Sequence, residues 1–141
     1  MIDTQKNRSF LLHDILTLQS IPLYKSRGWK NKNKMPVYHI VLFRLKPGVT
    51  QEQLANWART AKAMVGKIPG LISLHTNAPL PISVPRAKGF NMGLVAVLEL
   101  PEHVAGYAAH PAHLEVHKMR EELCEDTLAY DLEFEGEVGG K

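Results

Sequence analysis

The sequence predicts an α+β domain of the ferredoxin-like class, with the element order β-α-β-β-α-β and an antiparallel sheet. The main observation is strand-like alternation in four segments, 37–45, 71–76, 90–100 and 127–134. A second observation is helical spacing over 50–68, between the first two of these segments. A third is a later helical region that a proline divides in two. We therefore expect one sheet with helices on one of its faces.

The 141 residues suffice for one ordinary domain, and their charge is unevenly distributed. Residues 1–34 contain seven Lys or Arg and two Asp, a balance of +5. The other 107 residues contain ten Lys or Arg and twelve Asp or Glu, a balance of −2. We expect a basic, poorly patterned extension at 1–34, a domain at 35–135 and a polar tail at 136–141. A nucleic-acid-binding domain carries its basic residues on a folded face, so no nucleic-acid partner is expected.

Cysteine usage and hydropathy bear on the compartment. Cys124 is the single cysteine, so no disulfide can form within the chain, which fits a reducing environment. No apolar run reaches the roughly 20 residues that span a bilayer. The first residues also lack the basic segment and uninterrupted apolar run of a signal peptide. These features predict a cytoplasmic protein without a membrane partner.

Local signals define the individual elements. Thr50 and Gln53 fit a capping box, and apolar residues at helical spacing follow until Pro69–Gly70 stops the helix. The apolar stripe of this helix comprises Leu54, Trp57, Ala58, Ala61, Met64, Val65 and Ile68. The three prolines within 78–88 predict a loop without regular structure.

The first and third strands are apolar on both faces. Helices on one side of the sheet bury only one of these faces, and an exposed apolar face promotes aggregation. A second copy of the chain could cover it with its own sheet. We therefore predict a homodimer through the face bearing Tyr38, Ile40, Leu42, Val95 and Val97.

The densest group of chemically active side chains has the spacing Tyr107-x-x-His110-Pro111-x-His113. Proline starts a helix well but cannot continue one, so a short helix is expected to end near residue 109 and a second to begin at Pro111 or the next residue. This break brings the tyrosine and both histidines to one junction. Imidazole transfers protons near neutral pH, and a phenol donates a hydrogen bond to a carbonyl or enolate oxygen.

Two other interpretations of this stretch stand beside the catalytic one. His110 can serve in a purely structural polar cluster that caps chain ends. A metal could also bind His110, His113 and His117, since the last two lie four residues apart on one helix face. No acidic or cysteine cluster accompanies these histidines, so we expect a site without a metal.

Together these residues resemble the stress-responsive A/B barrel family, whose members are dimeric α+β barrels. The likeness covers about residues 36–135. It rests on His39, the helix start at Thr50, Pro69–Gly70 and, most specifically, the His110-Pro111-Ala112-His113 element. The best-understood relatives are plant polyketide cyclases such as olivetolic acid cyclase. The resemblance implies a homodimer and, in each subunit, a pocket between the sheet and its helices.

The resemblance also implies roles for individual residues. His113 matches the catalytic base, and Tyr107 matches the tyrosine that holds the substrate carbonyl. His39 matches a pocket histidine on the first strand, and His110 matches its companion histidine. The remaining substrate-binding positions are Val41, Phe43, Trp57, Leu74, Met92 and Leu94.

Two departures from the cyclase concern the pocket. Met92 stands where the cyclase has a pocket histidine, and Cys124 stands where it has a pocket aromatic residue. These replacements imply a pocket that is more apolar and differently shaped, so the substrate need not be the same.

The residues and the resemblance together predict a cofactor-independent cyclase or lyase acting on a poly-β-keto or phenolic substrate. His113 would remove a proton between two carbonyls, Tyr107 would stabilise the enolate oxygen, and the pocket would fold the chain for intramolecular aldol closure. The expected ligand is an apolar or aromatic small molecule, with no cofactor. The alternative is a non-catalytic dimeric stress-response protein that binds such a ligand without converting it.

Overall fold

A computed structural model describes residues 35–136. The expected extension at 1–34 and most of the expected tail lie outside these residues. The elements are β1 (Val37–Leu45), α2 (Gln51–Lys62), β2 (Leu71–Asn77), the 3₁₀-helix η1 (Pro81–Arg86), β3 (Met92–Leu98), α3 (His103–Ala109), α4 (Pro111–Leu123) and β4 (Cys124–Glu133). This order confirms the predicted β-α-β-β-α-β plan, with the second helical region split into α3 and α4.

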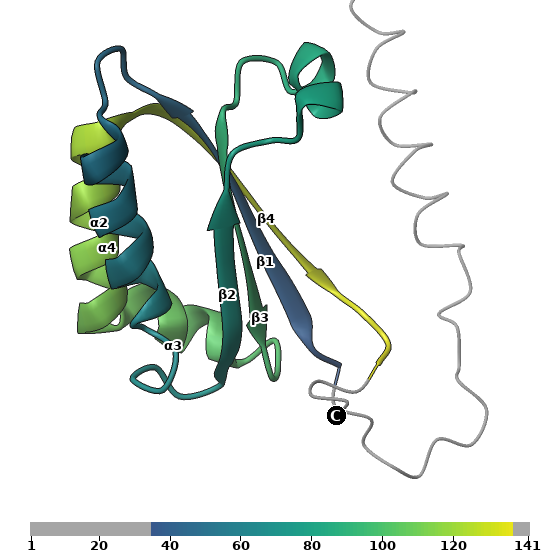
Figure 1. Cartoon of the computed structure of the whole chain (residues 1–141). Coiled ribbons are helices and arrows are strands. Elements are labelled where there is room, and N and C mark those ends of the chain that lie inside the picture. Colours follow the sequence, from purple (N-terminus) through teal and green to yellow (C-terminus); the bar gives the residue numbers. More distant parts are fainter. Residues whose placement is uncertain (1–34, 137–141) are drawn as a thin grey trace, which may run out of the picture. The chain divides into compact units, whose positions relative to one another are not determined.

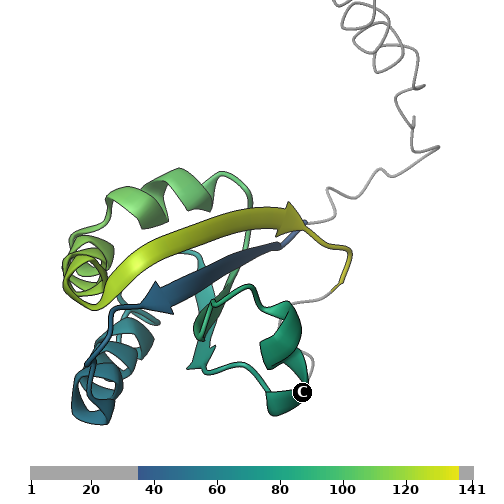
Figure 2. The ribbon, with the colours of Figure 1, turned by 90° about the horizontal axis from the view of Figure 1, so that it is seen from above.

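The four strands form one antiparallel sheet in the order β2-β3-β1-β4. Strands β1 and β3 are central, and the helices cover only one of their two apolar faces. Helices α2, α3 and α4 all lie on one face of the sheet (Figures 1 and 2). The predicted ferredoxin-like class is therefore confirmed.

Alternate residues of the strands face the helices and form the core. Val37, Val41 and Phe43 of β1 are buried on this side, and so are Leu94 and Ala96 of β3. The helices contribute buried apolar side chains to the same core. These are Trp57 and Ala61 of α2, Tyr107 of α3, and Val116 and Leu123 of α4. Burial of these side chains supplies the main stabilisation of the fold.

Helix α2 begins as predicted and ends earlier. The Thr50 hydroxyl accepts a hydrogen bond from the Gln53 amide at 3.2 Å, and the Gln53 side chain accepts one from the Thr50 amide at 2.8 Å. The helix ends at Lys62, whereas the sequence pattern predicted continuation to Pro69. Turns follow, in which Gly66 has a φ of +87° that a helix cannot contain. The helical spacing of apolar residues therefore continues beyond the end of the helix.

Three further segments differ from the predictions. The segment 78–88 contains the 3₁₀-helix η1, because Pro81 at its first position fixes a φ that such a turn accepts. Strand β4 begins at Cys124, directly after α4, and so starts three residues earlier than predicted. Strand β3 is shorter than predicted and begins at Met92: the Phe90 amide donates to the Ala87 carbonyl in the preceding turn, and the Asn91 amide donates to the Phe43 carbonyl of β1.

The predicted break between α3 and α4 is present at His110 and Pro111. His110 is extended, with φ of −67° and ψ of 137°, and its Nδ1 accepts a hydrogen bond from the Ala112 amide at 3.1 Å. His110 is thus the N-cap of α4. Pro111 occupies the first helical turn, where its missing N–H costs nothing.

The face of the sheet opposite the helices carries no α-helix within residues 35–136 (Figure 1). Several apolar side chains on this face are exposed: Leu42, Ile72, Val95, Leu128, Tyr130 and Leu132. An apolar surface of this kind typically contacts another protein surface. Within the described part of the chain, no helix is long and apolar enough to cross a membrane.

Candidate active site

A cavity of about 330 Å³ lies between the sheet and the helices. Its wall combines apolar side chains with histidines and one arginine. The lining residues are His39, Val41, Phe43, Trp57, Leu94, Tyr107, His113, Val116, His117, Arg120, Thr127 and Ala129. A cavity of this size that joins apolar walls with a few converging polar groups is typical of a small-molecule site.

His113, Tyr107 and His39 meet at one end of this cavity, here called the acid–base end. The ring centroids of His113 and Tyr107 are 4.5 Å apart, and those of Tyr107 and His39 are 5.1 Å apart. The three side chains come from α4, α3 and β1 respectively. The helix break therefore brings the predicted base and the predicted donor into contact.

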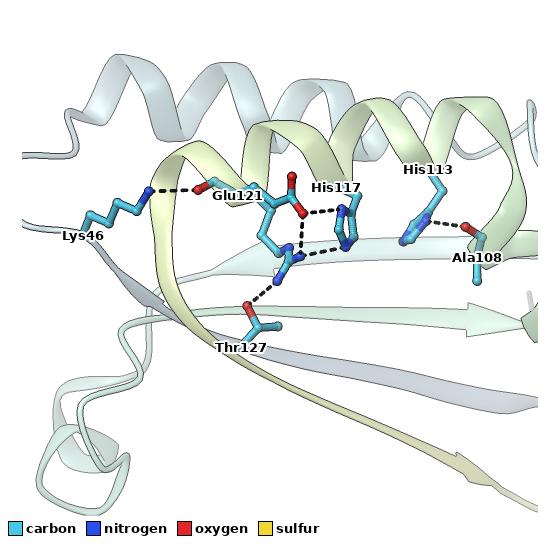
Figure 3. A network of polar contacts seen from close by, with 7 residues as sticks. Lys46, Ala108, His113, His117, Glu121 and Thr127 are labelled. Carbon is cyan, nitrogen blue, oxygen red and sulfur yellow. Dashed lines mark hydrogen bonds and ion pairs between the residues drawn. The ribbon is translucent and has the colours of Figure 1, made fainter.

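The surroundings of His113 fix its tautomer. Its Nδ1 lies 3.0 Å from the carbonyl oxygen of Ala108 (Figure 3), and a carbonyl can only accept a hydrogen bond, so Nδ1 carries the proton. In the neutral imidazole the unprotonated nitrogen is then Nε2. Burial lowers the pKa of His113 below its ordinary value of 6.5; the hydrogen bond to Ala108 partly opposes this shift, and the charge of the nearby Arg120 adds to it. The imidazole is neutral at physiological pH and can accept a proton at Nε2.

Tyr107 has the opposite role in proton exchange. Only 2% of the residue is exposed. Burial, together with the negative charge of Asp131, raises its pKa to about 12. The phenol therefore keeps its proton across the physiological range and can act as a hydrogen-bond donor.

A carboxylate orients the third member of this end. Asp131 of β4 accepts a hydrogen bond from His39 Nδ1 at 2.7 Å, because the two residues are register partners across β1 and β4. A charge-assisted hydrogen bond of this length holds the imidazole ring in one orientation. The rings of His39 and Tyr107 meet at an angle of 63°, in an edge-to-face arrangement.

The other end of the cavity, here called the arginine end, contains Arg120, His117 and Thr127. The guanidinium of Arg120 donates to Thr127 Oγ1 at 2.8 Å and to His117 Nε2 at 2.7 Å. The His117 ring therefore accepts at Nε2, while its Nδ1 lies 3.6 Å from a carboxylate oxygen of Glu121. His117 and Thr127 approach this network from α4 and β4 (Figure 3).

Helix and strand geometry separates the two ends. His113 and Arg120 are seven residues apart on α4, which is about 10 Å along the helix axis. On the sheet, His39 pairs with Asp131 and Phe43 pairs with Thr127, so the two ends lie four residues, or about 13 Å, apart along the strands. The walls between the two ends are apolar: Val41, Leu94, Val116 and Ala129. The cavity can thus hold an elongated molecule with one end at each polar group.

The structure brings together most of the residues singled out from the sequence. His39, Val41, Phe43, Trp57, Leu94, Tyr107 and His113 all line the cavity. His110 does not line it, because its Nδ1 is used to cap α4. Leu74 lies on β2, two strands away from β1, and is buried in the core under the helices. Met92 is likewise a core residue outside the lining.

Sequence reasoning missed the arginine end. The spacing of His113, Val116, His117 and Arg120 places them on one side of a helix, and this signal was available. Thr127 could not be found in the same way, because its position depends on the pairing of β4 with β1. The cavity is consequently more polar than the replacements at Met92 and Cys124 implied. Neither of these two residues lines it.

His110, His113 and His117 are the three histidines that the sequence offered as metal ligands. Within residues 35–136, no group of three or more His, Cys, Asp or Glu side chains has an arrangement that could hold a metal ion. The rings of His113 and His117 are 6.1 Å apart, and His110 and His117 each use a ring nitrogen in a hydrogen bond within the protein.

Known structures share this fold. The At3g17210 protein of Arabidopsis thaliana matches with 25% identity and a TM-score of 0.65, over 71% of this chain and 96% of that protein. A dimeric ferredoxin-like protein of unknown function from Bacteroides fragilis matches with 26% identity and a TM-score of 0.56, over 70% and 96%. The hydroxynitrile lyase of Passiflora edulis shares the fold at 20% identity and a TM-score of 0.65, over 75% and 99%.

Sequence comparison identifies the family. No curated protein gives a significant match to the chain. Residues 37–134, however, match the Stress responsive A/B Barrel Domain, and this range runs from the first residue of β1 to just beyond β4. It includes every residue that lines the cavity. The chain therefore belongs to the stress-responsive A/B barrel family.

Proposed function

We propose that this chain is a cofactor-independent enzyme of the cyclase or lyase type, which removes a proton next to a carbonyl group of a small, mainly apolar substrate. One observation supports this most strongly. The hydrogen bond from His113 Nδ1 to the Ala108 carbonyl leaves Nε2 as the basic nitrogen, on a ring whose centroid lies 4.5 Å from that of the protonated Tyr107 phenol. A base and a donor of this kind are the two groups that enolisation requires.

The reaction begins when His113 Nε2 takes a proton from the carbon between two carbonyls. The electron pair left on carbon moves to the carbonyl oxygen, and Tyr107 stabilises the developing enolate with its hydrogen bond. In a poly-β-keto substrate, the enolate carbon attacks a second carbonyl of the same chain and closes a ring. His113, now protonated, returns the proton to the new alkoxide. The apolar walls hold the chain folded for this attack.

The hydroxynitrile lyase neighbour supports the lyase half of this proposal only through its shared fold and its name. A hydroxynitrile loses its hydroxyl proton to a base before the carbon–cyanide bond breaks. A neutral imidazole beside a hydrogen-bond donor suits that step as well as enolisation. We favour ring closure over hydroxynitrile cleavage, because the cavity has room and polar groups for an elongated substrate.

Solvent exchange tests the proposed step without knowledge of the full substrate. The probe is methyl 3-oxooctanoate in deuterated buffer. Proton NMR follows the loss of signal from the two protons on the carbon between its carbonyls, as deuterium replaces them. The protein should accelerate this loss well beyond an equal concentration of free imidazole. Exchange at the rate of free imidazole would contradict the proposal and favour the binding-only alternative.

The proposal includes a homodimer through the open face of the sheet. Exposed apolar residues such as Leu42, Val95 and Tyr130 gather on this face, and the Bacteroides fragilis neighbour is described as dimeric. Ile40→Asp would place a charge in such an interface and should give monomers or insoluble protein. The control is Lys62→Asp, a charge change on the exposed end of α2. If the unaltered chain sediments as a monomer at micromolar concentration, the interface is wrong.

A further inference from the structure

The arginine end of the cavity contains a cation without a close anionic partner among residues 35–136. Arg120 donates to the Thr127 hydroxyl and to His117 Nε2, and both of these acceptors are neutral. Glu121 supplies the one carboxylate within 4.0 Å in this part of the chain, at 3.9 Å. That carboxylate side chain is 62% exposed, whereas the arginine side chain is 23% exposed. Water screens the long contact with Glu121, so most of the arginine charge remains uncompensated.

The guanidinium is held in place before any ligand arrives. Thr127 fixes it from β4, and His117 fixes it from α4 (Figure 3). The end of α4 is itself tied to the chain after β1, because Lys46 Nζ donates to the Glu121 carbonyl at 2.9 Å and the Lys46 amide donates to the Leu123 carbonyl at 2.8 Å. A cation positioned in this way loses little freedom when it binds an anion.

The surroundings strengthen attraction to an anion. Phe43, Trp57 and Val116 line the cavity beside the arginine end. Apolar walls lower the local dielectric constant, which increases the interaction between opposite charges. A guanidinium also has more N–H donors than its two hydrogen bonds use, and its planar fork matches a carboxylate.

We propose that the arginine end binds the carboxylate of a substrate whose reacting carbonyl lies at the acid–base end. The substrate class is then a free keto acid long enough to reach from His113 to Arg120, which lie about 10 Å apart along the axis of α4. An ester or an amide of the same acid would lack the charge that Arg120 recognises. This inference rests on the proposed function for the position of the reacting carbonyl, while recognition of the carboxylate stands on the arginine end alone.

The test compares two probes of equal size, 6-phenylhexanoate and 6-phenylhexanamide, by isothermal titration calorimetry on the full chain at pH 7.5 and low salt. The unaltered protein should bind the carboxylate at least about ten-fold more tightly than the amide, as expected for a hydrogen bond to a charged group. Arg120→Gln should remove this preference. The matched control Arg59→Gln, which changes an exposed arginine of α2 outside the cavity, should retain it.

Other results would overturn the inference. Equal affinity of the unaltered protein for the two probes would show that Arg120 only joins α4 to β4. A preference that survives Arg120→Gln would assign the carboxylate to another group. If Arg120→Gln fails to fold, the crystal structure of the unaltered protein with 6-phenylhexanoate decides instead. It should place the carboxylate within hydrogen-bond distance of Arg120, and a carboxylate beside His39 would contradict the inference.

The two proposals can fail separately. Proton exchange in methyl 3-oxooctanoate requires no carboxylate, so it reports on the acid–base end alone. If the protein does not accelerate exchange but still binds 6-phenylhexanoate more tightly than the amide, the enzymatic proposal is wrong and the cavity is a binding site for acids. If the protein accelerates exchange but binds the two probes equally, the enzymatic proposal stands and only the role of Arg120 is wrong.

Discussion

The two ends of the cavity differ in how their residues are arranged along the chain. Tyr107 and His113 of the acid–base end lie six residues apart, and one helix break brings them into contact. Arg120 of the arginine end depends on Thr127, which belongs to a strand whose position follows from its register with β1. A reactive pair can thus be encoded in a short motif. A specificity group needs the whole sheet to define its partners.

The charges of the two ends differ as well. His113 and Tyr107 are both neutral at physiological pH, because burial lowers the pKa of one and raises the pKa of the other. Arg120 is always charged. A neutral pair exchanges protons, while a fixed charge selects and orients. The variants below separate these two actions, beginning with the largest expected effect.

His113→Ala removes the proposed base. The rate of deuterium exchange into methyl 3-oxooctanoate should fall by about 10² to 10⁴. The change also removes one hydrogen bond to the Ala108 carbonyl, so the free energy of unfolding should fall by only about 1 kcal/mol. NMR measures the exchange rate, and thermal melting measures the stability.

Lys118→Ala is the matched control for this variant, since Lys118 is an exposed residue of the same helix. Its exchange rate should equal that of the unaltered protein. An unchanged rate in His113→Ala, or an equal loss in both variants, would show that His113 is not the base.

Tyr107→Phe deletes one hydroxyl and keeps the buried ring. Since the phenol is proposed to stabilise the enolate, exchange should slow by about 10² to 10³, as for the loss of one preorganised donor. The ring contacts with His39 and His113 remain available to phenylalanine, so the melting temperature should change little. A normal exchange rate with normal stability would assign Tyr107 to packing alone.

The exchange rate should depend on pH through His113. Burial lowers the pKa of its imidazole below 6.5, so protonation removes the base only in more acidic solution. The rate should therefore rise about tenfold per pH unit on the acid side and reach half of its maximum below pH 6.5. Since the pKa of Tyr107 is about 12, the plateau should extend through the neutral range. A midpoint above 6.5 in the NMR assay would contradict this.

Much of the fold could be predicted because its signals are local. The capping box at Thr50, the break at Pro111 and the alternation in β1 each depend on a few neighbouring residues. The end of α2 was mispredicted, because Met64 and Ile68 are buried in turns that preserve helical spacing. Hydrophobic periodicity reports burial, and burial does not require a helix to continue.

Some residues of the candidate site could likewise be predicted from local sequence, and others could not. The Tyr107 and His113 pair followed from sequence spacing together with family resemblance, and the cavity brings the two rings together. For His110 the sequence left open a pocket role and a capping role, and its Nδ1 caps α4. Two histidines three residues apart face different surroundings when a helix begins between them. Arg120 was missed because an arginine near the end of a helix is usually a solvated residue.

The smallest expected effect belongs to Thr127, which positions Arg120 without carrying charge. Thr127→Val keeps the shape of the side chain and removes the hydroxyl that accepts from the guanidinium at 2.8 Å. Arg120 keeps its charge and its contact with His117, so affinity for 6-phenylhexanoate should fall by only about two- to ten-fold, while affinity for the amide changes less. Thr60→Val is the control, since it removes one hydrogen bond to the Asn56 carbonyl on α2 outside the cavity. If both variants lower the affinities for both probes equally, Thr127 affects stability alone. A selective loss for the carboxylate in Thr127→Val would show that strand register contributes to ligand selection through the orientation of Arg120.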